Sequence, residues 1–453
     1  MPTLVRLASA AERCLSRLGP TAARRLVLSL FMKAVLGVQR IFHFDTLDDP
    51  GLAILTGGPR VLGRKVLGAR VRAAPVRGVL RLVRATKPRL ARAAEHVVSV
   101  DEHAIARFTR KFRIPKGFHS IRNKLRKVEK LFFVCATETS TLLTLVVTHG
   151  RATLTAVTQR LLPELRHRAQ GATLRVLLDS SAAQDHAALW SVVNHPRQVT
   201  LVRVRRTPGY RRAWAALPSV GWQRCEEPGP STHAPPKIVH IAKTQTTLTV
   251  DRTCQPARTV DVRTIVVREA QSHGKERWHA LWVFGDETTP AWDLVQQFRQ
   301  RQHHEQLHRL LVHDLFVDAA PSGYVKTSPN PDRPGFRQNA LTLYAWLAAR
   351  AADALTMLSE ALPLGARARH PRTIRRWLLL VPADLFLGHG TLLVVLYPRR
   401  LRRLWQQLIE CANHRPIRIP WLDDRKLILS LDPPYTTSPE MPSSPNSHGP
   451  DAG

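Results

Sequence analysis

The spacing of apolar residues predicts helices at the start of the chain. Over residues 1–40, apolar positions recur at helical intervals, with Leu26, Leu30 and Phe31 on an inner face and arginines on the outer one. Apolar and Arg positions interleave at similar spacing over residues 63–92. We therefore expect a helical and strongly basic N-terminal region at 1–95.

The pattern changes to short apolar runs after residue 95. The runs VVSVD, KLFFVCATE, TLLTLVVTHG and LRVLLD are typical of buried strands, and a helix-like stretch separates the last two. An order of strand, strand, strand, helix, strand predicts an α/β core, whose first part we place at 96–198.

The second half of the chain divides into four further segments. Runs such as KIVHIAKTQTTLTVD predict an all-β insertion, and two long helical patterns follow it. An apolar stretch at 377–396 contains Pro382, Asp384 and His389, which favours a buried helix pair or helix and strand over a membrane span. The predicted segments are a β-rich insertion at 199–290, core helices at 291–362, a helical C-terminal part at 363–431 and a disordered, Pro/Ser-rich tail at 432–453.

The composition indicates a polyanionic partner. Sixty-eight Lys and Arg residues face 34 Asp and Glu residues, which gives a formal net charge of +34. A positive field of this size is most commonly used to bind nucleic acid through its phosphates. GC-rich coding would explain the excess of Arg over Lys, but it does not explain the shortage of acidic residues.

The cysteines and the first residues favour a cytoplasmic location. The five cysteines are isolated in sequence and do not suggest a disulfide framework. The opening segment is interrupted by charge and lacks the order of a signal peptide. We expect a cytoplasmic protein without a membrane partner.

Three acidic residues stand out as candidate metal ligands. Asp101 follows the apolar run VVSV and Asp179 follows LRVLL, so both are expected at one edge of the sheet, where α/β folds place their ligands. Glu305 lies in an amphipathic helix with Arg301 and His308 on the same face. Three carboxylates suit a pair of Mg²⁺ ions, which prefer hard oxygen ligands. Taken singly, each acid has a simpler explanation as a turn, a helix cap or a surface ion pair.

The stretches VVSVDEHAIARF, LRVLLDSSAAQ and FRQRQHHEQLHRLL resemble the catalytic motifs of DDE transposases of bacterial insertion sequences. The resemblance covers about residues 42–400. It implies an RNase H-like mixed-sheet core interrupted by a β-rich insertion, with Asp101, Asp179 and Glu305 as the catalytic and metal-binding triad. It further implies two Mg²⁺ ions, with Mn²⁺ as a substitute. The implied reaction is cleavage of the element's ends and transfer of the 3′-hydroxyl into target DNA.

The same resemblance implies partners and DNA contacts. The partners would be double-stranded DNA, as terminal inverted repeats and target, and a second copy of the chain in a synaptic dimer associated with the bacterial nucleoid. In the family's Tyr, Arg, Glu, Lys motif this chain has Phe298, Arg301, Glu305 and Val312, so a hydroxyl and a cation are missing. The candidate DNA-binding residues are Phe298, Arg301, His308, Arg309, Lys111, Lys116, Arg122 and Lys124.

Two other functions fit the same residues. A metal-dependent nuclease would cut without strand transfer, and a transposase-derived protein would bind DNA without catalysis. The His303–His304 pair and His308 lack the companion ligands of a transition-metal site, so we expect them in solvent or facing phosphate. Trp278, Trp282 and Cys135 are expected to pack in the interior.

Overall fold

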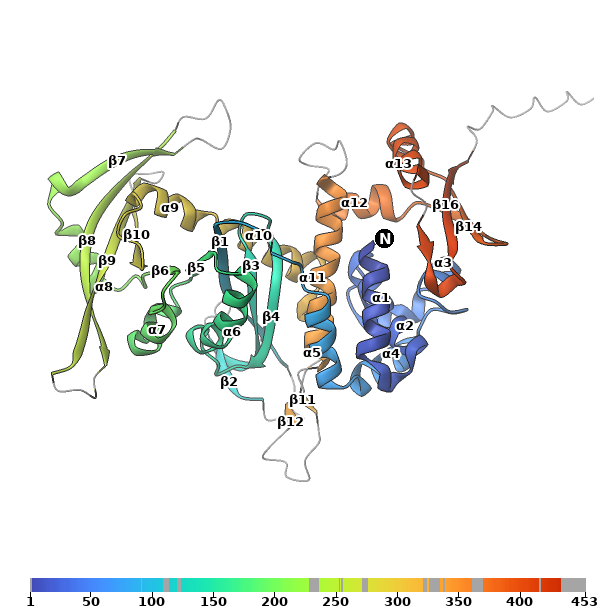
Figure 1. Cartoon of the computed structure of the whole chain (residues 1–453), viewed down its shortest axis with the longest axis horizontal. Helices are drawn as coiled ribbons and strands as arrows, with labels where there is room; N and C mark the ends of the chain where they lie inside the picture. Colours follow the sequence, from blue (N-terminus) through green and yellow to red (C-terminus); the bar gives the residue numbers. More distant parts are fainter. Residues whose placement is uncertain are drawn as a thin grey trace, which may run out of the picture. The chain divides into compact units, whose positions relative to one another are not determined.

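A computed structural model describes most of the 453-residue chain. The described residues are 2–90, 92–108, 114–119, 124–227, 236–251, 253, 256–270, 276–320, 324–325, 335–336, 339–360, 370–414 and 417–432. The chain separates into two compact units, Pro2–Pro371 and Arg372–Gly453. Figure 1 labels helices and strands in both units.

The first unit begins with helices, as the sequence predicts. They are α1 (Pro2–Cys14), η1 (Ser16–Leu18), α2 (Pro20–Val35), η2 (Ile41–Thr46), α3 (Pro50–Leu55), α4 (Arg64–Ala73) and α5 (Val76–Ala85). The later helix α11 (Asn339–Glu360) packs against α2, α5 and strand β4 (Thr141–His149). Its small and apolar residues are buried on most sides, which permits these several contacts. Among the described residues, no helix is both long and apolar enough to cross a membrane.

A sheet of ten described strands forms the centre of the first unit. Its order is β2-β3-β1-β5-β6-β10-β9-β8-β7, with β4 paired to β3. Strands β1, β5 and β6 are parallel neighbours, and the other neighbouring pairs are antiparallel. The strands are β1 (Glu95–Ala106), β2 (Lys116–His119), β3 (Lys124–Ala136), β5 (Thr173–Leu178), β6 (Gln198–Arg203), β7 (Trp222–Glu227), β8 (Lys237–Asp251), β9 (Arg258–Ala270) and β10 (Glu276–Phe284).

The predicted insertion extends this sheet, and the structure corrects its predicted start at 199 and its predicted all-β content. The strand that begins near residue 199 is β6, which pairs in parallel with β5 and so belongs to the core. Strand β10 pairs with the other edge of β6 and continues the ladder into β9, β8 and β7. The physical reason is that an open edge on β6 would leave backbone groups unpaired. The connection between β6 and β7 contains α8 (Pro208–Ala215) and η5 (Ser219–Gly221).

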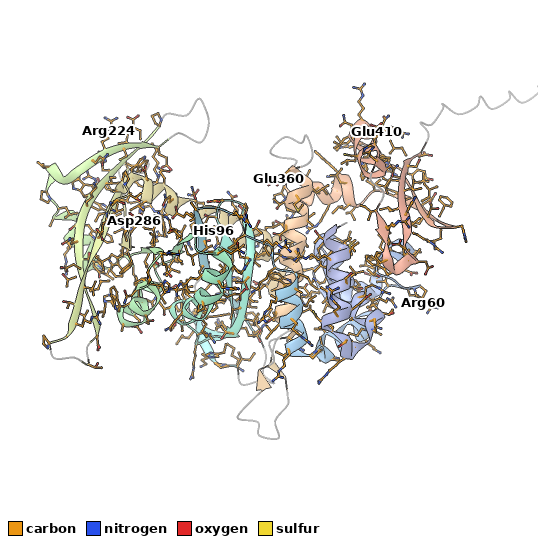
Figure 2. The ribbon with its side chains drawn as sticks, in the orientation of Figure 1. Arg60, His96, Arg224, Asp286, Glu360 and Glu410 are labelled. Carbon is orange, nitrogen blue, oxygen red and sulfur yellow. The ribbon has the colours of Figure 1, made fainter. Side chains whose placement is uncertain are left out.

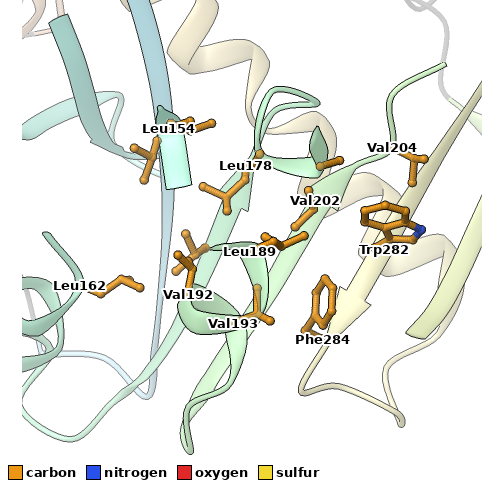
Figure 3. Packing of buried hydrophobic residues seen from close by; sticks show 14 of the residues in the cluster. Leu154, Leu162, Leu178, Leu189, Val192, Val193, Val202, Val204, Trp282 and Phe284 are labelled. Carbon is orange, nitrogen blue, oxygen red and sulfur yellow. The ribbon is translucent and has the colours of Figure 1, made fainter. Parts of the chain in front are cut away.

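Alternate residues along the strands face opposite sides of the sheet, and different helices cover the two sides. One face carries Val98, Val100, Leu178 and Val202 and is covered by α6 (Leu154–Ala169) and α7 (His186–Val193), as Figure 3 shows for part of this cluster. The opposite face carries Val97, Leu177 and Leu201 and is covered by α9 (Ala291–Arg299). Trp278, Trp282 and Cys135 are buried, which confirms their predicted packing.

The remaining elements of the first unit are short. They are η4 (Ala182–Gln184), α10 (Gln302–Arg309), the π-helical turn η7 (Leu310–Asp314), η8 (Val317–Ala319), β11 (Tyr324–Val325), β12 (Gly335–Phe336) and the start of α12 (Pro371–Ile374). The first of the two predicted long helical patterns is therefore not one helix, because α9, α10 and η7 divide it.

The second unit is a small sheet with one helix on it, so the predicted helical part at 363–431 is also wrong. Strands β13 (Ala383–Gly388) and β14 (Thr391–Leu396) form a hairpin, and Gly390 at its turn has a φ of +71°. The left-handed turn favours glycine and directs the apolar run back on itself. The sheet order is β13-β14-β16-β15. The other elements are η10 (Arg375–Leu379), α13 (Arg402–His414), β15 (Arg418–Ile419), η11 (Pro420–Leu422) and β16 (Arg425–Leu431).

Candidate active site

Two of the three predicted carboxylates lie on neighbouring parallel strands. The last ladder pair between β1 and β5 is Val100 with Leu178, and the next residues are Asp101 and Asp179. Asp179 follows the end of β5, as predicted. Asp101 does not follow a strand end, because β1 continues to Ala106 and pairs Asp101 with Phe133 of β3. Both aspartates lie on the sheet face that packs against α9, because they share the alternation of Val97 and Leu177.

The third carboxylate comes from the helix that follows α9. The helix is interrupted between α9 and α10, and Arg301 is the N-cap residue of α10. Glu305 therefore lies in the first turn of α10, one turn after Arg301. The break in the helix places Arg301 and Glu305 beside the point where pairing between β1 and β5 ends.

The guanidinium of Arg301 brings the three carboxylates together. Its Nη2 donates to Oδ2 of Asp101 at 2.8 Å, and its Nη1 donates to Oε1 of Glu305 at 3.3 Å. Nη1 also lies 3.9 Å from Oδ1 of Asp179. Burial would lower the pKa of Arg301, but the charges of Asp101, Asp179 and Glu305 raise it above its ordinary value. The cation is therefore fixed in its charged form.

The carboxylates outnumber the cations in this cluster. Arg301 supplies one positive charge, and Arg203 adds a longer contact, 4.0 Å, to Oδ1 of Asp179. Side-chain exposure rises from 18% at Asp101 to 32% at Asp179 and 63% at Glu305. The cluster therefore keeps a negative charge and is open to solvent on the Glu305 side.

Two histidines of α10 lie under this cluster. Nδ1 of His304 lies 2.5 Å from Oγ of Ser99, and His304 is only 1% exposed. The ring of His308 packs edge-on against His103, whose Nε2 lies 2.5 Å from Oδ1 of Asp318. Burial lowers the pKa of both His304 and His308 to about 4. The expectation that they face solvent or phosphate is therefore wrong, and alternate residues of β1 hold α10 by polar contacts.

The other predicted DNA-binding residues fall into different environments. Phe298 is buried in the cluster under α9, so its ring does not face a ligand. Arg309, Lys116 and Lys124 are exposed, whereas Lys111 and Arg122 lie outside the described residues. Val312, at the position of the missing cation, is half-buried in η7.

Lys130 of β3 and Arg107, which follows β1, pair with two further acids of the sheet. Nζ of Lys130 lies 3.0 Å from Oε1 of Glu102, and Nη2 of Arg107 lies 2.6 Å from Oε2 of the fully buried Glu129. Glu102 falls at a position that alternation along β1 assigns to an apolar face, and an acid at such a position was the signal in the sequence. These cations support the strand pairs of the core and are not free for DNA.

A separate basic surface lies on the N-terminal helices. Five exposed arginines line a cleft of about 910 Å³ beside α4 and α5, and the sequence from Pro50 to Ala94 contains no Asp or Glu. On α5 three of them recur at helical spacing, which places them on one face. The arginines are Arg17, Arg72, Arg77, Arg81 and Arg84.

The carboxylate cluster has suitable donors for a hard divalent cation. Oxygen ligands match Mg²⁺, and Oδ1 of Asp179 is buried without a hydrogen-bond partner among the described residues. Within the described part of the chain, no three His, Cys, Asp or Glu side chains are gathered closely enough to form a ready-made metal site. The carboxylates are directed at the guanidinium of Arg301.

Comparisons with known proteins give distant similarity to solved structures alone. No protein-family model and no curated protein matches the chain. Among solved structures, it is similar to a piggyBac transposase synaptic complex with hairpin DNA, with a TM-score of 0.41 and 13% identity. The match covers 89% of this chain and 77% of that one.

Proposed function

We propose that this chain is a DNA transposase whose catalytic carboxylates are Asp101, Asp179 and Glu305. The observation that carries the proposal is their convergence on one guanidinium from three separate parts of the chain. The order β4-β3-β1-β5-β6, with an antiparallel half and a parallel half, supports the RNase H-like core that the sequence motifs imply.

The three carboxylates would hold two Mg²⁺ ions, with Mn²⁺ as a substitute. When bound, such ions supply Lewis-acid activation of an attacking oxygen and stabilise the leaving oxygen in phosphoryl transfer. Glu305, the most exposed of the three, reaches the side from which DNA would approach. The contacts of buried His304 with Ser99 and of half-buried His308 with His103 fix the orientation of α10 and hence of Glu305.

The charge distribution supports double-stranded DNA as the substrate. The chain has a net charge of +34, and the arginines of α4 and α5 provide a surface for phosphate contacts. Terminal inverted repeats, target DNA and a synaptic homodimer in the bacterial cytoplasm belong to the same proposal. A nuclease without strand transfer would use the same carboxylates, so the reaction products distinguish a nuclease from a transposase.

Purified full-length protein should cleave a duplex that carries the DNA ends flanking its gene, in the presence of Mg²⁺. Asp101→Asn, Asp179→Asn and Glu305→Gln should each reduce cleavage by at least about a thousandfold, because each removes one metal ligand, while DNA affinity measured without divalent ions changes little. Asp293→Asn removes an exposed carboxylate from neighbouring α9 and serves as the matched control.

Labelled 3′ ends joined to a target plasmid would identify strand transfer, and cut ends without joining would identify the nuclease. Normal cleavage by any of the three carboxylate variants would contradict the site.

A further inference from the structure

Arg301 lies among the three carboxylates that are proposed to bind metal. Its two terminal nitrogens lie within 4.0 Å of oxygens of all three carboxylates, so it neutralises part of their charge. A divalent cation that bound the same oxygens would be repelled by the guanidinium at short range. Arg301 and the metal therefore compete for the same carboxylate oxygens.

The carboxylates do not satisfy Arg301 completely. Its Nε is buried and has no hydrogen-bond partner among the described residues. A guanidinium has five N–H donors in a planar fork, and a phosphate can accept two of them in parallel. A DNA phosphate at the open Glu305 side would therefore offer Arg301 an alternative partner.

We propose that Arg301 is a resident counterion that exchanges partners. In the metal-free protein it holds the three carboxylates together, and when divalent ions bind there it turns to a phosphate of the DNA. Metal and DNA then bind cooperatively. A bound metal displaces Arg301 from the carboxylates and frees it for the phosphate, and a bound phosphate draws Arg301 away and frees the carboxylates for the metal. This inference rests on the proposed function, since it takes DNA as the ligand.

Binding of Mn²⁺, followed by the electron paramagnetic resonance signal of the free ion, tests the exchange without measuring catalysis. The DNA is a duplex that ends at the cleavage position, so that the bond to be cut is absent. In the wild-type protein, this duplex should tighten Mn²⁺ binding about tenfold.

Arg301→Gln should bind Mn²⁺ about tenfold more tightly than wild type when DNA is absent, because the competing cation is gone. Adding the duplex should then change its affinity less than about twofold. Wild-type affinity together with wild-type coupling in this variant would overturn the inference.

Arg299→Gln is the matched control, since Arg299 is also a partly buried, ion-paired arginine but contacts Glu227 and Glu269 instead. It should keep the wild-type coupling.

If Arg301→Gln fails to fold even with Mn²⁺, Arg301→Lys carries the test. This variant keeps the positive charge but loses the planar fork of N–H donors. Without DNA it should bind Mn²⁺ as weakly as the wild type does, and the duplex should tighten Mn²⁺ binding less than in the wild type. Coupling equal to that of the wild type would overturn the inference.

The inference and the proposed function can fail separately. A wild-type protein that binds Mn²⁺ through the three carboxylates but cuts no DNA would overturn the function alone. DNA cleavage by the wild type, combined with unchanged Mn²⁺ binding in Arg301→Gln, would overturn the inference alone.

Discussion

Two arginines that are two residues apart form ion-pair clusters of opposite character. Arg299 contacts Glu227 and Glu269, and Lys237 completes the cluster at 2.9 Å from Glu269, so two cations face two acids. Arg301 is within ion-pair range of three acids, and among the residues that the structure describes only the more distant Arg203 adds to its positive charge. The first cluster is balanced and ties α9 to β7 and β9. The second retains negative charge, which is a feature of sites that bind cations.

Glu269→Gln should have the largest effect on stability. Glu269 is 5% exposed and has two cationic partners, so its loss leaves buried charge uncompensated and should destabilise the first unit by about 3 kcal/mol. Asp179→Asn, which relieves repulsion among acids, should change stability by less than about 1 kcal/mol in the presence of a chelator. Urea unfolding of both variants checks the contrast, and equal losses would remove the distinction between the clusters.

Acid should weaken the balanced cluster through His279, which lies beside Glu269. Burial lowers the pKa of His279 to about 4, against the opposing effect of Glu269, so the folded state favours the neutral ring. Its contribution is complete above pH 6.5 and is lost as pH falls from 6.5 towards 4, because the unfolded chain binds the proton first. Urea unfolding between pH 7 and pH 4.5 should show this fall, and His279→Gln should remove the part that His279 contributes, while His304 and His308, whose pKa values are lowered in the same way, keep theirs. An unchanged slope in the variant would rule out His279 as its source.

The smallest effect is expected on the N-terminal basic surface, outside both clusters. Arg77→Gln and Arg81→Gln should each weaken duplex binding less than about tenfold and reduce the salt dependence of log K by about one unit per lost phosphate contact. Fluorescence anisotropy at several salt concentrations measures both quantities. Arg224→Gln, an exposed arginine on β7 labelled in Figure 2, is the control and should leave them unchanged.

The sequence predicted most core elements because their patterns are local. Apolar runs identified β1, β3, β4 and β5, and Asp179 directly follows one of them. The pattern placed Asp101 at a strand end, although β1 continues through HAIA, where alternation is less clear than in VVSV. In the second unit, the Leu- and Val-rich run fitted helix and strand equally well, and only tertiary pairing decided it.

The contacts of α10 could not be predicted in the same way. Its sequence, QHHEQLHR, contains a single apolar residue, Leu307, so apolar periodicity alone does not indicate which face meets the sheet. His304 is buried because Ser99, which lies about 200 residues earlier, faces it across the fold. The role of Arg301 likewise depends on acids from two distant strands and is visible only once the strands are paired.

Iron-directed cleavage of the polypeptide tests the central claim most directly. Fe²⁺ in place of Mg²⁺, with ascorbate and peroxide, produces radicals that cut the backbone beside the bound metal. We predict cuts near Asp101, Asp179 and Glu305 in the wild-type protein, their suppression by excess Mg²⁺ and their loss in Asp101→Asn. Cuts confined to other segments, or cuts that persist in Asp101→Asn, would contradict a metal site formed by these three carboxylates.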